Sequence, residues 1–152
     1  MKALIQRVAR ASVAVEGRPL TETGKGYLVL LGVTRNDTEE DASYLARKTI
    51  GLRIFPDLDG KMNLSIQQID GEILVVSQFT LCANTKKGNR PSFVEAARPE
   101  EADRLYNLYI NLLRQCMSPE KVKTGTFQAS MSVELVNDGP VTIELNSSQS
   151  PD

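Results

Sequence analysis

Hydrophobic and polar residues alternate in several short runs of this chain, and two longer stretches repeat apolar residues every three or four positions. The first run covers residues 3–15, where small and branched apolar residues occupy alternate positions near the end. Residues 27–33 are apolar almost throughout, as in a strand that is covered on both faces. Residues 71–81 begin as an apolar strand and finish in hydroxyl and amide side chains. We therefore predict β-strands at these places.

The two stretches with helical spacing carry acidic residues near their starts, which suit the positive end of a helix. The first covers residues 38–52, and Asp37 and Glu40 make a capping-box-like start. The second has Pro99 in its first turn and ends before Pro119. Its predicted apolar face consists of Ala102, Leu105, Tyr106, Tyr109, Leu112, Leu113 and Cys116.

The end of the chain carries two strand-like runs, 133–136 and 141–145, joined by the sequence NDGP. Asp-Gly between alternating apolar residues is typical of a tight hairpin. However, Pro140 stands where the second strand should start, and it has no amide for the ladder. X-Pro is also the type of peptide bond that tolerates the cis form. Gly139-Pro140 is therefore either a plain turn with a strand start or an exposed, rigid dipeptide with a purpose of its own.

Strands in blocks, interrupted by two helices, indicate an α+β fold. We predict a largely antiparallel sheet or barrel with both helices packed on its outside. A chain of 152 residues is most simply one domain, large enough to bury a core without metal or disulfide staples. We assign residues 1–146 to this domain and expect 147–152 to form a flexible tail.

The composition limits the partners and the compartment. The formal charge is −1 at pH 7, so any contact with nucleic acid must come from a local basic patch. No apolar run approaches the ~20 residues that span a bilayer. Gln6 and Arg7 interrupt the N-terminal stretch where a signal peptide would remain apolar. These features favour the cytosol. Cys82 and Cys116 form no CxxC pair, so we expect neither a disulfide framework nor a zinc site.

The chain contains no histidine. This excludes Ser-His and Cys-His nucleophilic pairs, histidine-ligated metals and an imidazole general base. Asp57, Asp59 and Gly60 resemble the start of a calcium loop, but the later ligands are missing, so we interpret them as a turn. We predict chemistry without a metal, without a cofactor and without a side chain that ordinarily titrates near neutrality.

Two polar segments are candidates for function. Residues 77–80, Ser-Gln-Phe-Thr, are either the solvent-facing end of a strand or a site whose amides and hydroxyls stabilise a developing oxyanion. Thr80 is a weak candidate nucleophile, because no histidine can activate it. The second segment is a glycine-containing loop with Lys86, Lys87 and Arg90. These cations either keep the surface soluble or hold phosphates beside a reaction centre.

Six stretches together resemble the motifs of the D-aminoacyl-tRNA deacylase family. They follow one another in the expected order up to about Leu145: QRVARASV at 6–13, LVLLGVT at 28–34, LRIFPDLDGKMNLS at 52–65, SQFTL at 77–81, KKGNRPSF at 86–93 and NDGPVT at 137–142. Each motif alone is modest, but six in register are specific. The resemblance implies a cytoplasmic homodimer that hydrolyses the ester between a D-amino acid and tRNA. It also implies cleavage of glycyl-tRNA mischarged onto the tRNA for alanine.

The resemblance further implies roles for particular residues. Gly139-Pro140 would be cis and would enter the active site of the other subunit, where its carbonyls take the substrate's α-amino group and leave no space for an L side chain. The other implied residues are the catalytic candidates Thr80 and Gln78, the pocket residues Ser77, Phe79 and Met131, and Arg7 as the support of the Gly-Pro loop.

Two mechanisms are compatible with the resemblance. In one, the hydroxyl of Thr80 is the nucleophile. In the other, the backbone amide at this position forms the oxyanion hole and the terminal 2′-hydroxyl of the tRNA assists the attacking water. The second agrees better with a chain without histidine, because an aminoacyl ester is already reactive and a single oxyanion donor contributes ~10²–10³.

The chain also departs from the family pattern. Gln128 and Ser130 occupy positions where the family usually has glycine and aspartate, and Asn84 replaces a common aspartate. Two other functions remain as alternatives: a catalytically idle module that binds nucleic acid through the basic loop, and a hydrolase of small esters that needs no tRNA.

Overall fold

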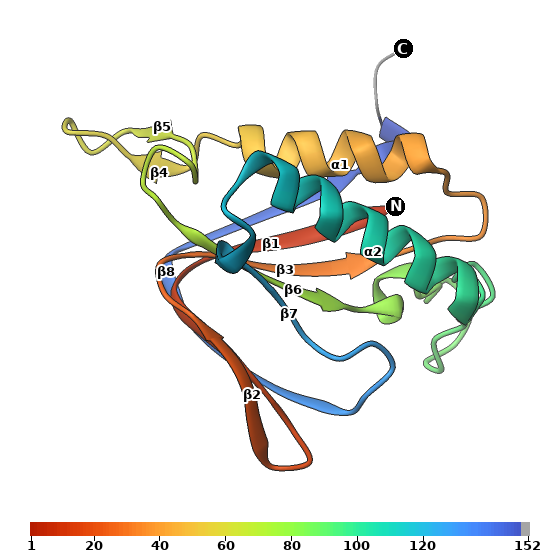
Figure 1. Ribbon diagram of the computed structural model, residues 1–152. Helices are drawn as coiled ribbons and strands as arrows, with labels where there is room; N and C mark the ends of the chain where they lie inside the picture. The colour runs from red at the N-terminus through yellow and green to blue at the C-terminus, as the bar shows by residue number, and fades with distance from the viewer. Residues whose placement is uncertain (150–152) are drawn as a thin grey trace.

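The computed structural model describes residues 1–149, which form a strongly curved sheet with two helices packed on one face (Figure 1). The strands of the main sheet are β1 Lys2–Val15, β2 Arg18–Thr23, β3 Gly26–Gly32, β6 Glu72–Ser77, β7 Val122–Thr124 and β8 Met131–Asn146. A small separate hairpin consists of β4 Phe55–Pro56 and β5 Met62–Leu64. The predicted α+β class with both helices outside the sheet is confirmed.

The long strand β1 organises the sheet. It pairs antiparallel with β2, β3 and β8, while β3 and β6, and β6 and β7, pair parallel. The resulting order is β2-β1-β3-β6-β7, with β8 on β1. The antiparallel prediction therefore holds for the pairs that β1 makes with β2, β3 and β8. Because β3 and β6 run parallel, their C-terminal ends lie at one edge of the sheet. Functional groups gather at that edge.

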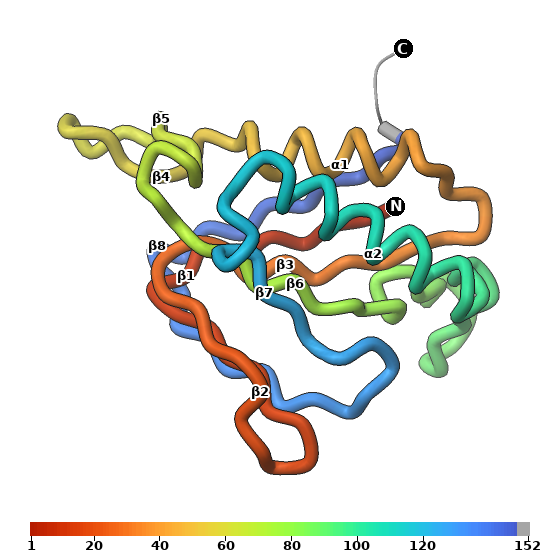
Figure 2. Tube along the Cα trace, viewed as in Figure 1, coloured from red at the N-terminus to blue at the C-terminus, as the bar shows by residue number. Residues whose placement is uncertain are grey.

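Of the two alternatives left open for residues 137–140, the structure does not show the plain turn between two strands. β8 is one strand from Met131 to Asn146, and both of its halves pair with β1. Val8 pairs with Asn137 and Gln6 with Thr142, so the residues between them bulge out of the ladder opposite Arg7. Figure 2 shows β8 continuing along β1 through this bend. Pro140 is tolerated because a bulge releases its position from the ladder.

The first helix, α1, covers Glu39–Gly51. Its capping box is formed by Thr38 and Asp41, one residue later than the predicted pair of Asp37 and Glu40. Asp37 instead accepts hydrogen bonds of 2.5 Å from the backbone amide of Thr34 and from the N-terminal ammonium of Met1. These bonds hold the start of β1 beside the start of the helix.

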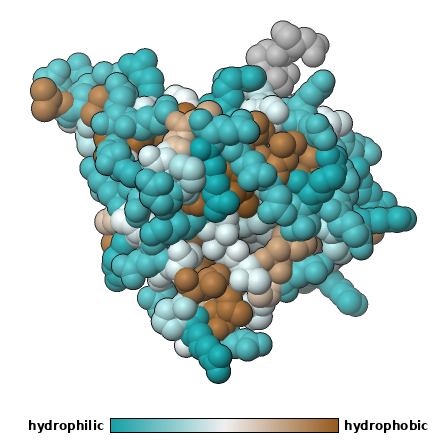
Figure 3. Space-filling view, in the orientation of Figure 1, coloured by the Kyte–Doolittle hydropathy of each residue, from teal (hydrophilic) through white to brown (hydrophobic). Residues whose placement is uncertain are grey.

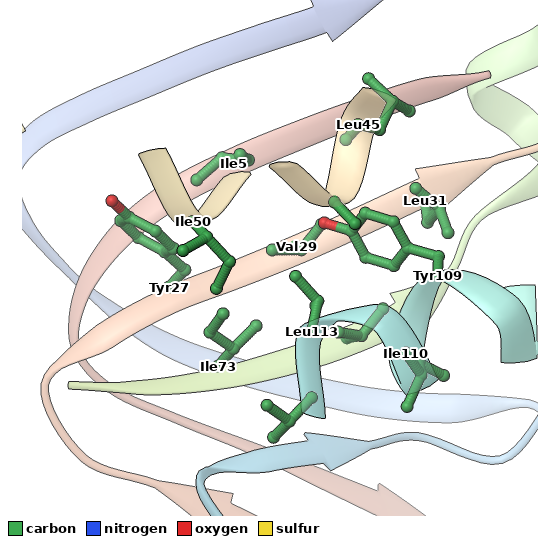
Figure 4. Close-up of a cluster of buried hydrophobic side chains, with 14 of the residues drawn as sticks. Ile5, Tyr27, Val29, Leu31, Leu45, Ile50, Ile73, Tyr109, Ile110 and Leu113 are labelled. Carbon is green, nitrogen blue, oxygen red and sulfur yellow. The ribbon is translucent and has the colours of Figure 1, made fainter. Parts of the chain in front are cut away.

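The second helix, α2, covers Pro99–Cys116 with Pro99 in its first turn, as predicted. Ile110 belongs to its buried face, although the sequence analysis missed it, and Cys116 is exposed rather than packed. Tyr109 is fully buried, and its hydroxyl lies 2.8 Å from Oγ1 of Thr49 in α1. Figure 4 shows this part of the core, where apolar side chains from both helices meet β1, β3 and β6.

Polar and apolar side chains are unevenly distributed over the surface. Figure 3 shows a mainly polar face, with apolar side chains grouped toward its lower part and at the far tip of the β4–β5 hairpin. Leu58, in the loop between β4 and β5, is fully exposed. No helix within residues 1–149 is long and apolar enough to cross a membrane.

The end of the domain packs against its beginning. Ser147 starts a short 3₁₀ turn, is buried, and accepts a hydrogen bond of 2.5 Å from the Met1 ammonium. The flexible tail predicted for residues 147–152 lies partly outside the described residues, and its boundary stays a prediction.

Candidate active site

A cavity of about 670 Å³ lies where the end of β6, the start of α2 and the loop before β8 converge. Figure 2 shows these three segments on the same side of the molecule. Four predicted site residues line the cavity, namely Ser77, Gln78, Phe79 and Met131. The other lining residues are mainly apolar and include Val33, Val76, Ala97, Phe127 and Val133. The structure therefore brings distant motifs together around one apolar space.

The chain turns sharply at the mouth of this cavity. β6 ends at Ser77, earlier than predicted, and a 3₁₀ helix, η1, covers Phe79–Cys82. The backbone amide of Gln78 donates to the carbonyl of Leu31 at 2.8 Å, which ties the turn to the end of β3. Gly32 makes this approach possible: a Cβ atom there would lie 3.0 Å from Cβ of Leu81 and 3.1 Å from the carbonyl oxygen of Gln78.

Two backbone amides at this turn have no acceptor. Within residues 1–149, neither the amide of Phe79 nor that of Thr80 donates a hydrogen bond to another group. Both are at the start of η1, where the helical pattern leaves amides unpaired. Phe79 lines the cavity, and both amides belong to the turn that begins there. Unpaired amides fixed by a packed turn can stabilise an oxyanion.

The hydroxyl of Thr80 is held by Gln78. The side-chain amide of Gln78 donates to Oγ1 of Thr80, and an amide cannot act as a base. Thr80 is exposed and does not line the cavity. The described part of the chain therefore gives this hydroxyl an orienting partner rather than a group that removes its proton.

Two lining residues of the cavity, Phe79 and Gln128, have notable surroundings. Phe79 is 55% exposed and packs edge-on against Phe93, with ring centroids 5.0 Å apart. Phe93 belongs to the KKGNRPSF motif but was not among the predicted site residues. On the other wall, Gln128 has a φ of 62°. This left-handed conformation is the one that glycine, the usual family residue at this position, adopts without strain.

The predicted gate residues do not reach the cavity of their own subunit. Gly139 and Pro140 are exposed and do not line it, and Figure 2 shows the bend of β8 on the opposite side from the cavity segments. The peptide bond between them is cis, as the resemblance implied. Arg7, which is only 8% exposed, donates from Nε to the carbonyl of Asp138 at 2.8 Å. This hydrogen bond is the contact that the predicted supporting role of Arg7 would need, and the role itself stays a prediction.

The basic loop lies beyond η1. An isolated antiparallel bridge between Asn84 and Ser92 closes its base, and Lys86, Lys87 and Arg90 are all exposed. Among the described residues these three cations form no ion pair. The loop is therefore an open cationic surface on the same side as the turn at Gln78.

The site offers little acid–base chemistry. The nearest thiol, Cys82, is buried, and this burial raises its pKa, so it remains protonated near neutrality. In residues 1–149 no three or more side chains of the types that bind metals gather in one place. The groups available at the cavity are thus backbone amides, amide and hydroxyl side chains, and an apolar wall.

Comparisons with known proteins agree with the motifs. A family model described as D-Tyr-tRNA(Tyr) deacylase matches residues 4–146. A protein of Dehalococcoides mccartyi named D-aminoacyl-tRNA deacylase is 59% identical over 147 residues, which cover 97% of this chain and 95% of the relative. One of the same name from Geobacter sulfurreducens is 56% identical over 146 residues, with 96% and 95% covered.

Two solved structures have the same fold. One is described as c-Myc DNA Unwinding Element Binding Protein; it has a TM-score of 0.92 and 45% identity, and each chain is covered completely. The other is described as a probable eukaryotic D-amino acid tRNA deacylase; it has a TM-score of 0.83 and 15% identity, with 95% of this chain and 97% of the other covered. From the family match over nearly its whole length, this chain belongs to the D-Tyr-tRNA(Tyr) deacylase family of hydrolases.

Proposed function

We propose that this protein hydrolyses the ester that links a D-amino acid to the 3′-terminal ribose of tRNA and releases the free amino acid and tRNA. The observation that carries this proposal is the pair of unpaired amides, of Phe79 and Thr80, on the turn whose residues Gln78 and Phe79 line the cavity. The names of the relatives at more than half identity support the substrate class. We place the reaction in the cytoplasm, where charged tRNA is used.

The amides stabilise the charge that develops during hydrolysis. Water attacks the ester carbonyl, and the carbonyl oxygen becomes an oxyanion that the amides of Phe79 and Thr80 receive. The acyl C–O bond then breaks, the ribose oxygen takes the proton that the water loses, and the acid is released. One donor of this kind contributes about 10²–10³ in kcat. That is enough for an activated ester, so the absence of histidine is no obstacle.

The proton transfers do not need Thr80 as a nucleophile. Its hydroxyl accepts from Gln78, whose amide is no base, and no other side chain within residues 1–149 makes a hydrogen bond with it. The substrate itself carries a 2′-hydroxyl next to the ester, which can assist the attacking water. The protein's task in this mechanism is to position the ester against the amides.

The apolar cavity explains a broad choice of side chains. With a volume of about 670 Å³ and a mainly apolar wall, it has room for large and small amino acids. We propose that glycine, which has no side chain to reject, is also cleaved when it is mischarged onto the tRNA for alanine. Gln128, with its left-handed backbone, lines the cavity and would tune this activity, and Ser130 lies in the chain between the lining residues Ala129 and Met131.

Selection of the D configuration is proposed to need a second subunit. Gly139 and Pro140 are exposed and lie away from their own cavity, and Arg7 fixes the bulge that presents them. In a homodimer this bulge would enter the partner's cavity, and its carbonyls would receive the α-ammonium group. An L side chain would then collide with the bulge, so L esters would be excluded whatever their side chain.

The first experiment is hydrolysis of D-Tyr-tRNA and L-Tyr-tRNA side by side, with a chelator and with protein-free controls. Rapid loss of the D ester alone would support both the activity and the chiral selection. Loss of both esters would leave an esterase without the proposed gate. Loss of neither would contradict the deacylase activity. Glycyl-tRNA, charged on the tRNA for alanine, tests the second substrate in the same assay.

Entry of the bulge into the partner's site is tested by mixing two inactive variants. Pro140→Trp enlarges the bulge, and Ala129→Trp fills the cavity wall. If the bulge acts on the partner, a mixed dimer contains one site with an intact cavity and an intact bulge, so mixing restores up to half of the wild-type activity per mixed dimer. If each subunit uses its own bulge, mixing restores none.

Binding of nucleic acid without catalysis is the alternative. The structural relative named for a DNA element and the exposed cations of the basic loop favour it. A binding module would retain tRNA, with a salt dependence set by Lys86, Lys87 and Arg90, but would not cleave either ester. A hydrolase of small esters would instead cleave D-tyrosine methyl ester as fast as the tRNA ester.

A further inference from the structure

A second cavity, of about 390 Å³, adjoins the turn that forms the candidate active site. Unlike the apolar cavity, it is lined mainly by polar residues, with Cys82 and Ala83 among its few apolar ones. The polar lining residues are Lys2, Thr34, Asn84, Thr85, Lys86 and Glu95. We call it the Lys2 cavity. It has no part in the acyl chemistry described above.

The two cavities share a wall. Thr34 lines the Lys2 cavity and forms an antiparallel bridge with Ala96, which lines the apolar cavity. On the same two segments, Val33 lines the apolar cavity and Glu95 the Lys2 cavity. Consecutive Cα atoms are about 3.8 Å apart, so the cavities are next to one another. The short helix η1 spans both, since Phe79 at its start lines the apolar cavity and Cys82 at its end lines the Lys2 cavity.

The chemistry of the Lys2 cavity suits an anion. Lys2 uses one Nζ donor on the carbonyl of Leu81, at 3.4 Å, and an ammonium group has three donors. Lys86 makes no ion pair with any residue in the range 1–149. Its backbone amide donates to Oδ1 of Asn84 at 3.0 Å, which holds it beside the cavity. Glu95 is the one acidic group in the lining, so cations outnumber it.

We propose that the Lys2 cavity binds the phosphodiester that joins the terminal nucleoside of the substrate to the nucleotide before it. The inference rests on the proposed function, because the ester then occupies the apolar cavity and the RNA chain leaves it past η1. Lys2 and Lys86 hold the phosphate from two sides, and Thr85 supplies a hydroxyl donor. The contact positions the ester carbonyl against the amides of Phe79 and Thr80 without touching the reacting atoms.

The test compares two minimal substrates. One is D-tyrosyl-adenosine, which has no phosphate, and the other is a 3′-terminal dinucleotide with D-tyrosine on its last ribose, which has one phosphodiester. We expect the wild-type protein to cleave the dinucleotide ester with a kcat/KM at least tenfold higher, through a lower KM. In the double variant Lys2→Gln/Lys86→Gln the kcat/KM for the dinucleotide ester falls at least tenfold, so the preference over D-tyrosyl-adenosine is lost. The preference also falls with added salt, because a phosphate contact releases counterions.

Controls separate the inference from the proposed function. The double variant Lys48→Gln/Lys61→Gln changes the charge equally at two exposed positions outside both cavities and keeps the preference. If the wild type cleaves both substrates equally well, or if the Lys2/Lys86 variant keeps the preference, the inference is wrong and the proposed function stands. If the wild type cleaves no D ester, the proposed function fails first.

Discussion

Nε of Arg7 donates a hydrogen bond of 2.8 Å to the backbone carbonyl of Asp138, directly before Gly139-Pro140. Nη1 of the same guanidinium donates to the carbonyl of Ile54 at 2.5 Å. One buried side chain of β1 therefore joins the bulge of β8 to the segment that follows α1. The bulge is far from the helices in the sequence. The planar guanidinium group of Arg7 sets the position of the bulge.

Replacing Arg7 with lysine should loosen the bulge. Lysine keeps the charge but lacks the rigid fork that reaches two carbonyls, and a hydrogen bond to a charged group contributes about 1.5–3 kcal/mol. We expect Arg7→Lys to lower the free energy of unfolding by about this amount in urea denaturation, and to raise the rate for L-Tyr-tRNA relative to D-Tyr-tRNA. Arg18→Lys, at an exposed position, is the matched control. Unchanged selectivity in Arg7→Lys would show that the bulge needs no such support.

The hydroxyl of Thr80 and its backbone amide should differ in importance. Removing the hydroxyl with Thr80→Ala takes away only the group held by Gln78, so we expect kcat to fall less than tenfold. Replacing the amide with an ester, by incorporating the matching α-hydroxy acid at position 80, removes one oxyanion donor and should lower kcat by ~10²–10³. Single-turnover hydrolysis of D-Tyr-tRNA measures both. Complete loss in Thr80→Ala would instead assign the nucleophile to the hydroxyl.

A methyl group at Gly32 should displace the catalytic turn. Its Cβ would lie within 3.0–3.3 Å of Leu81, Gln78 and Cys82, so η1 must move. Overpacking of this kind costs about 1–3 kcal/mol of stability, and we expect kcat for D-Tyr-tRNA to fall more than tenfold because the amides move with the turn. Gly51→Ala is the control, since nothing lies within 4 Å of the added atom. Normal kcat in a folded Gly32→Ala protein would show that the position of η1 does not matter.

Local patterns in the sequence predicted the helices and most strands. The spacing of Leu105, Tyr109 and Leu113 identified α2, because a buried helical face repeats at 3–4 residues. The pattern around residues 137–140 could not decide between a hairpin turn and an exposed dipeptide. Alternation shows that a segment is a strand but not which strand it pairs with, and both halves of β8 pair with β1. Such long-range pairing is set by packing of the whole sheet.

The candidate site was predicted only in part. The resemblance pointed to Ser77, Gln78, Phe79 and Met131, which line one cavity, while their roles stay predictions. The close approach of η1 at Gly32 was missed, because a contact between two distant segments leaves no local pattern in the sequence. The sequence alone did not explain why glycine is usual at the position of Gln128. The φ of 62° explains it, because glycine adopts this left-handed conformation without strain.

The loop between β4 and β5 should depend on pH through Asp57. The carboxylate accepts hydrogen bonds from the amides of Lys61, at 3.0 Å, and Asp59, at 2.9 Å, and from the side chain of Asn63, at 3.1 Å. These bonds, that from Lys61 above all, lower the pKa of Asp57 below its ordinary value. A lowered pKa in the folded state means that the ionised carboxylate stabilises the loop. This stabilisation is complete above the unfolded pKa of about 3.9 and is lost as the pH falls through the folded pKa.

Nuclear magnetic resonance can follow this transition residue by residue. Between pH 6 and pH 2, we expect the amide signals of Asp59 and Lys61 to shift together, with a midpoint below about 3.9. In Asp57→Ala both amides should lack their acceptor at every pH, and the signals should resemble those of the wild type at low pH. Asp59→Ala should leave the titration at Lys61 unchanged, because the Asp59 side chain accepts none of the three bonds. A midpoint at or above the ordinary value in the wild type would mean that the loop is held by its backbone turn, and that the carboxylate contributes nothing to its order.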